Sequence, residues 1–135
     1  MKTQNLRVNQ LSPEAYAWYR NYLAALDAKN VERYGSFLAD DCALVMNNAE
    51  PVQGKDAVLN GLAGYWQSFR RLEHDLLNIY GTDQAFMLEA LNHYARLDGR
   101  AVTLRAVALT NRDEAGKVTS VRLYSDTSPL FAPVE

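Results

Sequence analysis

The sequence has little of several features that define common classes of protein. It contains a single cysteine, Cys42, which rules out an internal disulfide and is compatible with a reducing compartment. No apolar run approaches the length that spans a bilayer, and residues 1–10 lack the apolar stretch of a signal peptide. We therefore expect a cytoplasmic protein that does not enter a membrane.

A strong charge of either sign is also missing. The chain has 14 basic and 16 acidic residues, a formal net charge of −2, and the two signs are interspersed along the sequence. A protein that binds nucleic acid normally carries a basic face, because it must neutralise phosphates. This composition argues against a nucleic-acid partner.

The motifs of cofactor chemistry are absent as well. The two histidines, the cysteine and the scattered acids show none of the spacings of zinc sites. There is no glycine-rich phosphate loop, nucleophile elbow or dinucleotide fingerprint. We therefore expect no metal and no cofactor.

What the chain does contain is enough apolar material for one core. Of its 135 residues, 48% are hydrophobic, and this length is typical of a single domain, here 1–135 with a loose arm over 1–11. Ser12-Pro13-Glu14 is a good helix start. Shorter helical patterns follow from Asn30 and from Lys55, with a short strand over 42–46 between them.

The first predicted helix is apolar on more than one face. Tyr19, Leu23 and Leu26 recur at helical spacing, and Trp18, Tyr22 and Ala25 form an adjoining stripe. A helix of this kind packs against two different parts of the structure. We expect it to cover a sheet and also to border a pocket that touches Tyr22, Met46 and Trp66.

After Arg71 the period of the pattern changes from helix to strand. Four strand-like runs cover 72–81, 84–97, 100–112 and 117–126, joined by short turn sequences. Short connections between long strands indicate antiparallel neighbours. The sequence therefore predicts an α+β fold, with helices on one face of a curved sheet.

Three segments carry a resemblance to a known family. "YLAALDAKNVERYGSFLADDCALV", "VQGKDAV" and "GKVTSVRLYSD" resemble the SnoaL-like proteins and ketosteroid isomerases of the nuclear transport factor 2-like superfamily, from about Tyr16 to Phe131. The resemblance implies a cone-shaped, cystatin-like fold in which a curved, mostly antiparallel sheet wraps three helices around a deep apolar pocket. It also implies a frequent homodimer. The superfamily hosts isomerases, cyclases, dehydratases, hydrolases and non-catalytic binders, so the fold does not decide the function.

One functional position of the isomerases has a matching residue in this sequence, and two others do not. Tyr22 falls where the isomerases place the tyrosine that donates a hydrogen bond to the developing oxyanion. Met46 stands at the position of the general base, and 106–108 stand at the position of the second acid. Because neither a thioether nor a methyl group transfers protons, steroid isomerisation by that route is not expected.

Asp126 ends the last strand before an apolar Pro129-Leu130-Phe131 segment. SnoaL-like proteins often carry an aspartate there, and the related epoxide hydrolases place a working acid there. A segment that covers the pocket would raise the pKa of this carboxylate and make it an acid or base. The alternative is an aspartate that caps the following turn.

The histidines give the second pair of candidates. Scytalone dehydratase, a further relative, uses histidines near the positions of His74 and His93, and Asp27 matches an aspartate at the end of its first helix. Strand alternation favours His93 in the pocket with Met87 and Leu91. The expected site is therefore Asp126, His93, Tyr22 and His74, with a wall of Trp18, Met46, Trp66, Met87 and Leu91.

Two functions remain open at this stage. One is acid–base chemistry on a small apolar or polycyclic molecule, and the other is a pocket or dimer without chemistry. The strand over 100–112 is apolar on both faces, which predicts a homodimer through the outer face of the sheet.

Overall fold

The computed structural model describes residues 1–133, which form helices and one β-sheet. Its helices are α1 (Pro13–Asp27), α2 (Val31–Gly35), α3 (Lys55–Trp66) and α4 (Ser128–Phe131). Its strands are β1 (Val8–Asn9), β2 (Leu38–Met46), β3 (Val52–Gln53), β4 (Phe69–Gly81), β5 (Ala85–Arg96), β6 (Ala101–Arg112) and β7 (Val118–Tyr124).

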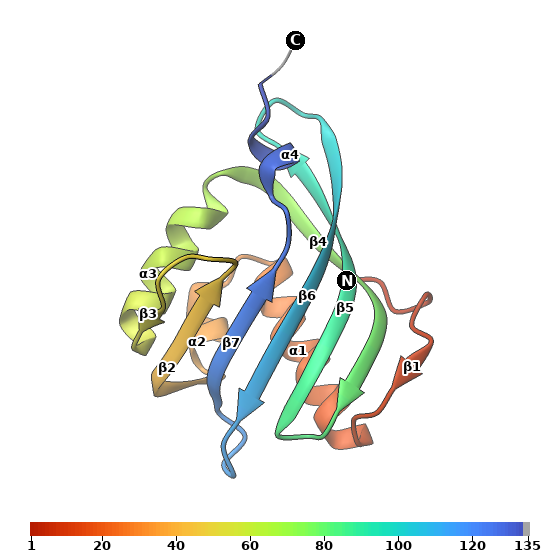
Figure 1. Cartoon of the computed structure of the whole chain (residues 1–135), viewed down its shortest axis with the longest axis vertical. Coiled ribbons are helices and arrows are strands. Elements are labelled where there is room, and N and C mark those ends of the chain that lie inside the picture. The colour runs from red at the N-terminus through yellow and green to blue at the C-terminus, as the bar shows by residue number, and fades with distance from the viewer. Residues whose placement is uncertain (134–135) are drawn as a thin grey trace.

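The strands form one curled sheet in the order β1-β4-β5-β6-β7-β2-β3 (Figure 1). The four long strands β4 to β7 are antiparallel neighbours, as the short turns between them predict. The pairs β1–β4 and β2–β7 are parallel. The prediction of an α+β fold with a curved, mostly antiparallel sheet is therefore confirmed.

Helices α1, α2 and α3 cover the inner face of this sheet (Figure 1). Ser12 starts α1, since its hydroxyl accepts a hydrogen bond from the backbone N–H of Ala15 at 3.1 Å. The inward face of the helix is buried almost completely, with 1% of Tyr19, 3% of Tyr22 and 2% of Leu23 exposed. This face meets buried side chains of the central strands, so the core lies between α1 and the sheet.

The N-terminal segment differs from the expectation of a loose arm. Val8 and Asn9 form β1 and pair with β4. Lys2 donates its backbone N–H to the carbonyl of His74 and accepts a hydrogen bond from the N–H of Leu76. The polar sequence of residues 1–11 concealed this pairing, because a strand at a sheet edge needs backbone groups rather than apolar side chains.

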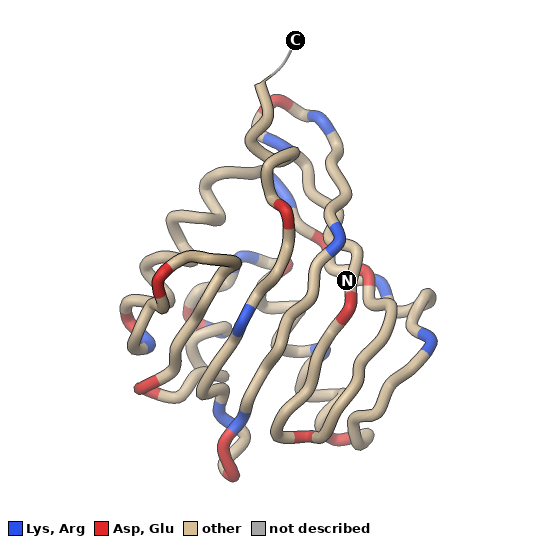
Figure 2. Tube along the Cα trace, in the orientation of Figure 1, with Lys and Arg blue, Asp and Glu red and all other residues tan. Residues whose placement is uncertain are grey.

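Charged residues of both signs are distributed over the molecule and are not segregated on one side (Figure 2). Within residues 1–133, no helix is long and apolar enough to cross a membrane.

Ser12 is the N-cap of α1 and Thr127 is the N-cap of α4. Replacing each by alanine tests how much the cap hydrogen bond of Ser12 stabilises the chain. We expect Ser12→Ala to lower the free energy of unfolding by about 1 kcal/mol, because it removes a cap hydrogen bond from the helix that carries the core. Thr127→Ala is the control, since the Thr127 side chain makes no cap hydrogen bond to α4. Urea denaturation of both variants measures the difference, and equal losses would contradict the assignment.

Candidate functional site

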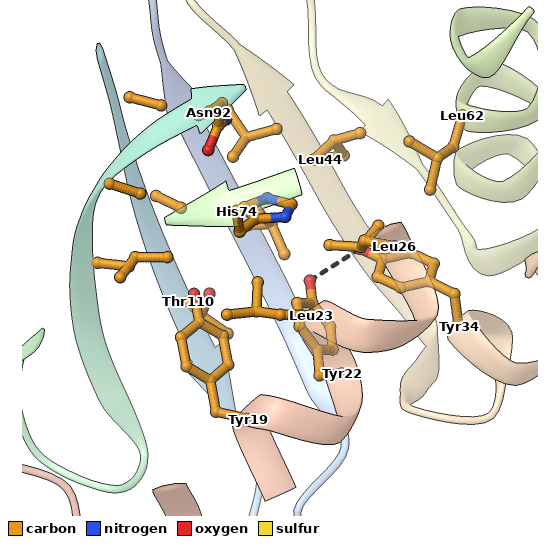
Figure 3. A pocket seen from close by; sticks show the side chains of 16 residues that line it. Tyr19, Tyr22, Leu23, Leu26, Tyr34, Leu44, Leu62, His74, Asn92 and Thr110 are labelled. Atoms are coloured by element: carbon orange, nitrogen blue, oxygen red, sulfur yellow. Dashed lines mark hydrogen bonds between the residues drawn. The ribbon is translucent and has the colours of Figure 1, made fainter. Parts of the chain in front are cut away.

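A cavity lies between α1 and the inner face of the sheet. Its volume is about 70 Å³. The helices contribute Tyr19, Tyr22, Leu23, Leu26, Tyr34 and Leu62, and the strands contribute Leu44, His74, Leu88, Ala90, Asn92, Ala106, Ala108, Thr110, Val121 and Leu123. Figure 3 shows these side chains pointing toward a common space. Because most of the lining is apolar, a ligand here must itself be mainly apolar.

His74 is the one imidazole in this lining, and β4 places it there by alternation. Leu72, His74 and Leu76 are all buried, with 7%, 8% and 0% exposed, and they share the inner face of the strand. The Nδ1 atom of His74 lies 2.5 Å from Oδ1 of Asp27. With Nδ1 occupied by this contact, Nε2 is the nitrogen left for a ligand.

Asp27 is the last residue of α1, and it is held by β4 at two points. Besides the ring contact, both carboxylate oxygens accept the backbone N–H of His74, at 3.3 and 3.2 Å. The amino group of Met1 also lies 3.1 Å from Oδ2. A carboxylate at the C-terminal end of a helix is opposed by the helix dipole. These contacts compensate for that position and fix the imidazole in one orientation.

The charge on Asp27 is favoured by the same contacts. Burial raises the pKa of Asp27, but the hydrogen bond and charge of His74 outweigh it, with help from the amino group of Met1. The resulting pKa is below the ordinary value of an aspartate. Asp27 is therefore an anion at neutral pH and an electrostatic partner for the imidazole.

Tyr22 and Tyr34 form a second polar pair in the lining. Their hydroxyl oxygens are 2.8 Å apart, within hydrogen-bond distance (Figure 3). Burial raises the pKa of Tyr34 to about 12 and raises that of Tyr22 well above its ordinary value. Both phenols therefore keep their protons at neutral pH, and one of the two hydroxyls has a proton free to donate to a ligand.

The structure places His93 on the opposite face of the sheet, so the expectation that it lines the pocket is wrong. Its Nε2 atom lies 2.9 Å from Asp75, and its Nδ1 atom lies 2.8 Å from the hydroxyl of Thr103. Met87 and Leu91 share this outer face. Strand alternation misled the assignment because the two faces of β5 have similar apolar content, and the inner set is in fact Leu88, Ala90 and Asn92.

Asp126 also lies elsewhere. It is exposed, and its side chain accepts the backbone N–H of Ser128 at 3.0 Å. The hydroxyl of Ser128 and its backbone N–H both lower the pKa of Asp126, whereas a covered site would raise it. Phe131 is 54% exposed, so the segment after Asp126 does not seal the carboxylate. The turn-cap alternative is the one that the structure contains.

Three expected wall residues fall outside the lining described for residues 1–133. Trp18 packs under the guanidinium of Arg112, whose Cζ is 4.3 Å from the ring centroid. Met46 ends β2, and Trp66 ends α3, where it meets Tyr34 edge-on. The cavity thus borders the stripe of Tyr19, Leu23 and Leu26, and of the adjoining stripe only Tyr22 belongs to the described lining.

Asn92 is, with Tyr34, a functional candidate that the sequence interpretation missed. It faces His74 across the β4–β5 ladder and lines the cavity. The available signal was its alternation with Leu88 and Ala90, two buried residues of that stretch.

Residues 1–133 hold no cluster of three or more histidine, cysteine or acidic side chains arranged to bind a metal.

The contact between Asp27 and His74 predicts a specific dependence of stability on pH. Because the pKa of Asp27 is lower in the folded chain, its contribution is present above the ordinary aspartate pKa of about 4. It is lost as the pH falls through the lower, folded value. We expect Asp27→Asn to cost about 2 kcal/mol at pH 7 and progressively less toward pH 3.

Urea denaturation at both pH values measures this gap. Asp41→Asn is the matched control, since Asp41 is exposed. A gap between wild type and Asp27→Asn that is constant with pH would contradict the stabilising role of the ionised Asp27 carboxylate.

Comparison with known proteins agrees with this architecture. A model of the SnoaL-like domain matches residues 19–121. A search of curated proteins found no significant match.

Solved structures give the same fold at low sequence identity. A putative SnoaL-like polyketide cyclase from Jannaschia sp. CCS1 is 15% identical, with a TM-score of 0.78 over 95% of this chain and 99% of that one. An LEH-like epoxide hydrolase from M. tuberculosis is 19% identical, with a TM-score of 0.71 over 87% and 86%.

A third structure, from Catenulispora acidiphila DSM 44928, is a hypothetical protein with a ketosteroid isomerase-like fold in complex with trimethylamine. It is 16% identical, with a TM-score of 0.74 over 90% of this chain and 92% of that one. At these identities the structures establish the fold, while the matched domain model covers most of the sequence. The chain therefore belongs to the SnoaL-like domain family.

Proposed function

We propose that the chain is an acid–base enzyme that acts on a small apolar molecule without a cofactor. The observation that carries this proposal is the Asp27–His74 pair at the wall of an apolar cavity, with an Nδ1–Oδ1 distance of 2.5 Å. An imidazole oriented by a buried carboxylate is a common arrangement for a general base. The reaction classes that it fits are isomerisation, cyclisation, dehydration and hydrolysis.

In this proposal His74 moves the proton. Its Nε2 atom accepts a proton from a carbon next to a carbonyl, or from a hydroxyl or a water, and later returns it. Asp27 stabilises the imidazolium that forms in between. The step uses only these two side chains, and the apolar lining strengthens their interaction by excluding water.

The hydroxyls of Tyr22 and Tyr34 take the second role. Both are buried, and their raised pKa values favour the protonated phenols. The hydroxyl that accepts the bond within the pair donates its own proton to the substrate oxygen. Charge that develops on that oxygen is then stabilised by a donor fixed in place before the reaction.

Two of the structural neighbours support this class of chemistry by name only. They are a putative polyketide cyclase and an epoxide hydrolase. The identities of 15% and 19% do not extend either activity to this chain.

A non-catalytic binding protein is the second candidate. The observation in its favour is that Ala106 and Ala108 line the cavity where the isomerase resemblance places a catalytic acid. In that case the cavity holds a small apolar ligand, and the Asp27–His74 pair has a structural role.

Exchange of the α-protons of cyclohexanone in D₂O, followed by ¹H NMR, separates the two candidates. The acid–base proposal expects the wild-type chain to accelerate exchange, and His74→Gln to reduce that acceleration roughly a hundredfold. Asp27→Asn removes the orienting partner, and we expect a loss of roughly tenfold.

The matched control is His93→Gln, which removes the histidine of the outer face and should leave exchange unchanged. Equal exchange by the wild type and His74→Gln would reject catalysis and favour the binding alternative.

We also propose a homodimer through the outer face of the sheet. The support is a group of half-buried or exposed apolar residues on that face, namely Met87, Leu91, Val107, Leu109 and Tyr124. Val107 lies at its centre, because it pairs with Glu89 on β5 and with Tyr124 on β7. A second copy would remove these side chains from water.

Sedimentation velocity at micromolar concentration tests the dimer. We expect the wild-type chain to sediment with the mass of two chains and Val107→Glu to sediment as a monomer, since a buried unpaired charge disrupts an interface. Leu97→Glu is the control, because Leu97 is 55% exposed and lies just after β5 in the turn to β6. A monomeric wild type would contradict the proposal.

A further inference from the structure

The cavity contains a hydrogen-bond acceptor that no side chain uses. The amide group of Asn92 lies beside the hydroxyl of Tyr94, but its Oδ1 atom is buried and has no hydrogen-bond partner within residues 1–133. An unpaired buried acceptor costs about 1–3 kcal/mol. Folded chains rarely keep such a group unless a ligand or another function accounts for it.

The position of Asn92 relates this acceptor to the proposed base. Asn92 and His74 are direct partners in the β4–β5 ladder, and both line the cavity (Figure 3). Direct partners on one face of an antiparallel pair have Cβ atoms about 4.5–5.5 Å apart. Two atoms of one ligand that are only one or two bonds apart can therefore contact Asn92 and His74 at the same time.

Thr110 also has a buried, unpaired hydroxyl, but it belongs to another part of the cavity. Its side chain lies beside the hydroxyl of Tyr19. Thr110 pairs with Phe86, six positions along β5 from Asn92, which is about 20 Å along an extended strand. A ligand small enough for this cavity does not reach from His74 to Thr110.

The remaining surroundings of His74 and Asn92 restrict the ligand further. Leu26, Leu44 and Leu62 complete this end of the lining, and all three are apolar. The cavity volume is about 70 Å³, well below the roughly 150 Å³ of an apolar cavity that takes up benzene. The ligand is therefore limited to about one small ring, and a polycyclic skeleton does not fit. The one polar group that such a ligand needs here is a hydrogen-bond donor.

We propose that Asn92 selects the substrate, by accepting a hydrogen bond from a hydroxyl group that lies beside the atom addressed by His74. The substrate class is a small, single-ring apolar compound that carries this hydroxyl. The inference rests on the proposed function in using the same cavity and the same base. It adds a preference for a donor, which the apolar lining and the tyrosine pair do not impose.

Toluene and phenol are a suitable pair of probes, because they have nearly the same shape and differ by a methyl and a hydroxyl group. The measured quantity is the ratio of the Kd of toluene to the Kd of phenol, from ¹H–¹⁵N NMR titrations. We expect Asn92→Leu to lower this ratio by about tenfold, because the hydroxyl loses its acceptor while the cost of removing each probe from water cancels.

Two variants serve as controls. Asn92→Asp keeps an acceptor at the same position and should keep the preference for phenol. Asn111→Leu makes the same change as Asn92→Leu at a half-buried asparagine of β6 outside the cavity lining described for residues 1–133, and should leave the ratio unchanged. If Asn92→Leu does not fold, the wild-type spectrum decides, since phenol but not toluene should shift the side-chain amide signals of Asn92.

An unchanged ratio in Asn92→Leu, or failure of both probes to bind the wild-type chain, would overturn the inference. The outcome is independent of turnover. If the ratio changes while His74→Gln leaves proton exchange unaffected, Asn92 selects a ligand for a binding protein and the proposed catalysis fails. If His74→Gln abolishes exchange while the ratio stays constant, catalysis stands and the role of Asn92 is rejected.

Discussion

The contact between Asp27 and His74 joins the end of α1 to the middle of β4, and the geometry of the site depends on it. One carboxylate accepts both the ring nitrogen and the backbone N–H of the same histidine. The helix therefore cannot slide along the sheet without breaking hydrogen bonds to a largely buried carboxylate. This constraint holds the imidazole at one place in the cavity wall and leaves its second nitrogen for a ligand.

The imidazole of His74 is surrounded by mostly apolar side chains. Most of the residues around it are leucine, alanine or valine, and the phenols of Tyr22 and Tyr34 bond to each other. Charges interact more strongly where water is excluded. A few polar groups in such a cavity thus have large effects, and the unpaired oxygen of Asn92 is the one beside the histidine.

The second histidine shows that the two faces of the sheet have separate roles. His93 contacts Asp75 and Thr103 on the outer face, one residue along β5 from Asn92 on the inner face. Alternation explains the separation, since successive side chains of a strand point to opposite sides. The chain has two histidine–aspartate pairs of similar distance, 2.5 and 2.9 Å, and only the inner one borders the cavity.

The sequence by itself determined the order of the three longer helical segments and the five long strands and the family resemblance, and it named Tyr22 and His74 among the candidates. These follow from local patterns: the cap at Ser12, the helical spacing in α1, and the short turns between β4 and β7. It did not determine which face of β5 lines the cavity, because both faces are partly apolar and only the packing of α1 distinguishes them. The tertiary structure also decided that Asp126 caps a turn and that β1 joins the sheet, since both depend on backbone partners that side-chain patterns do not reveal.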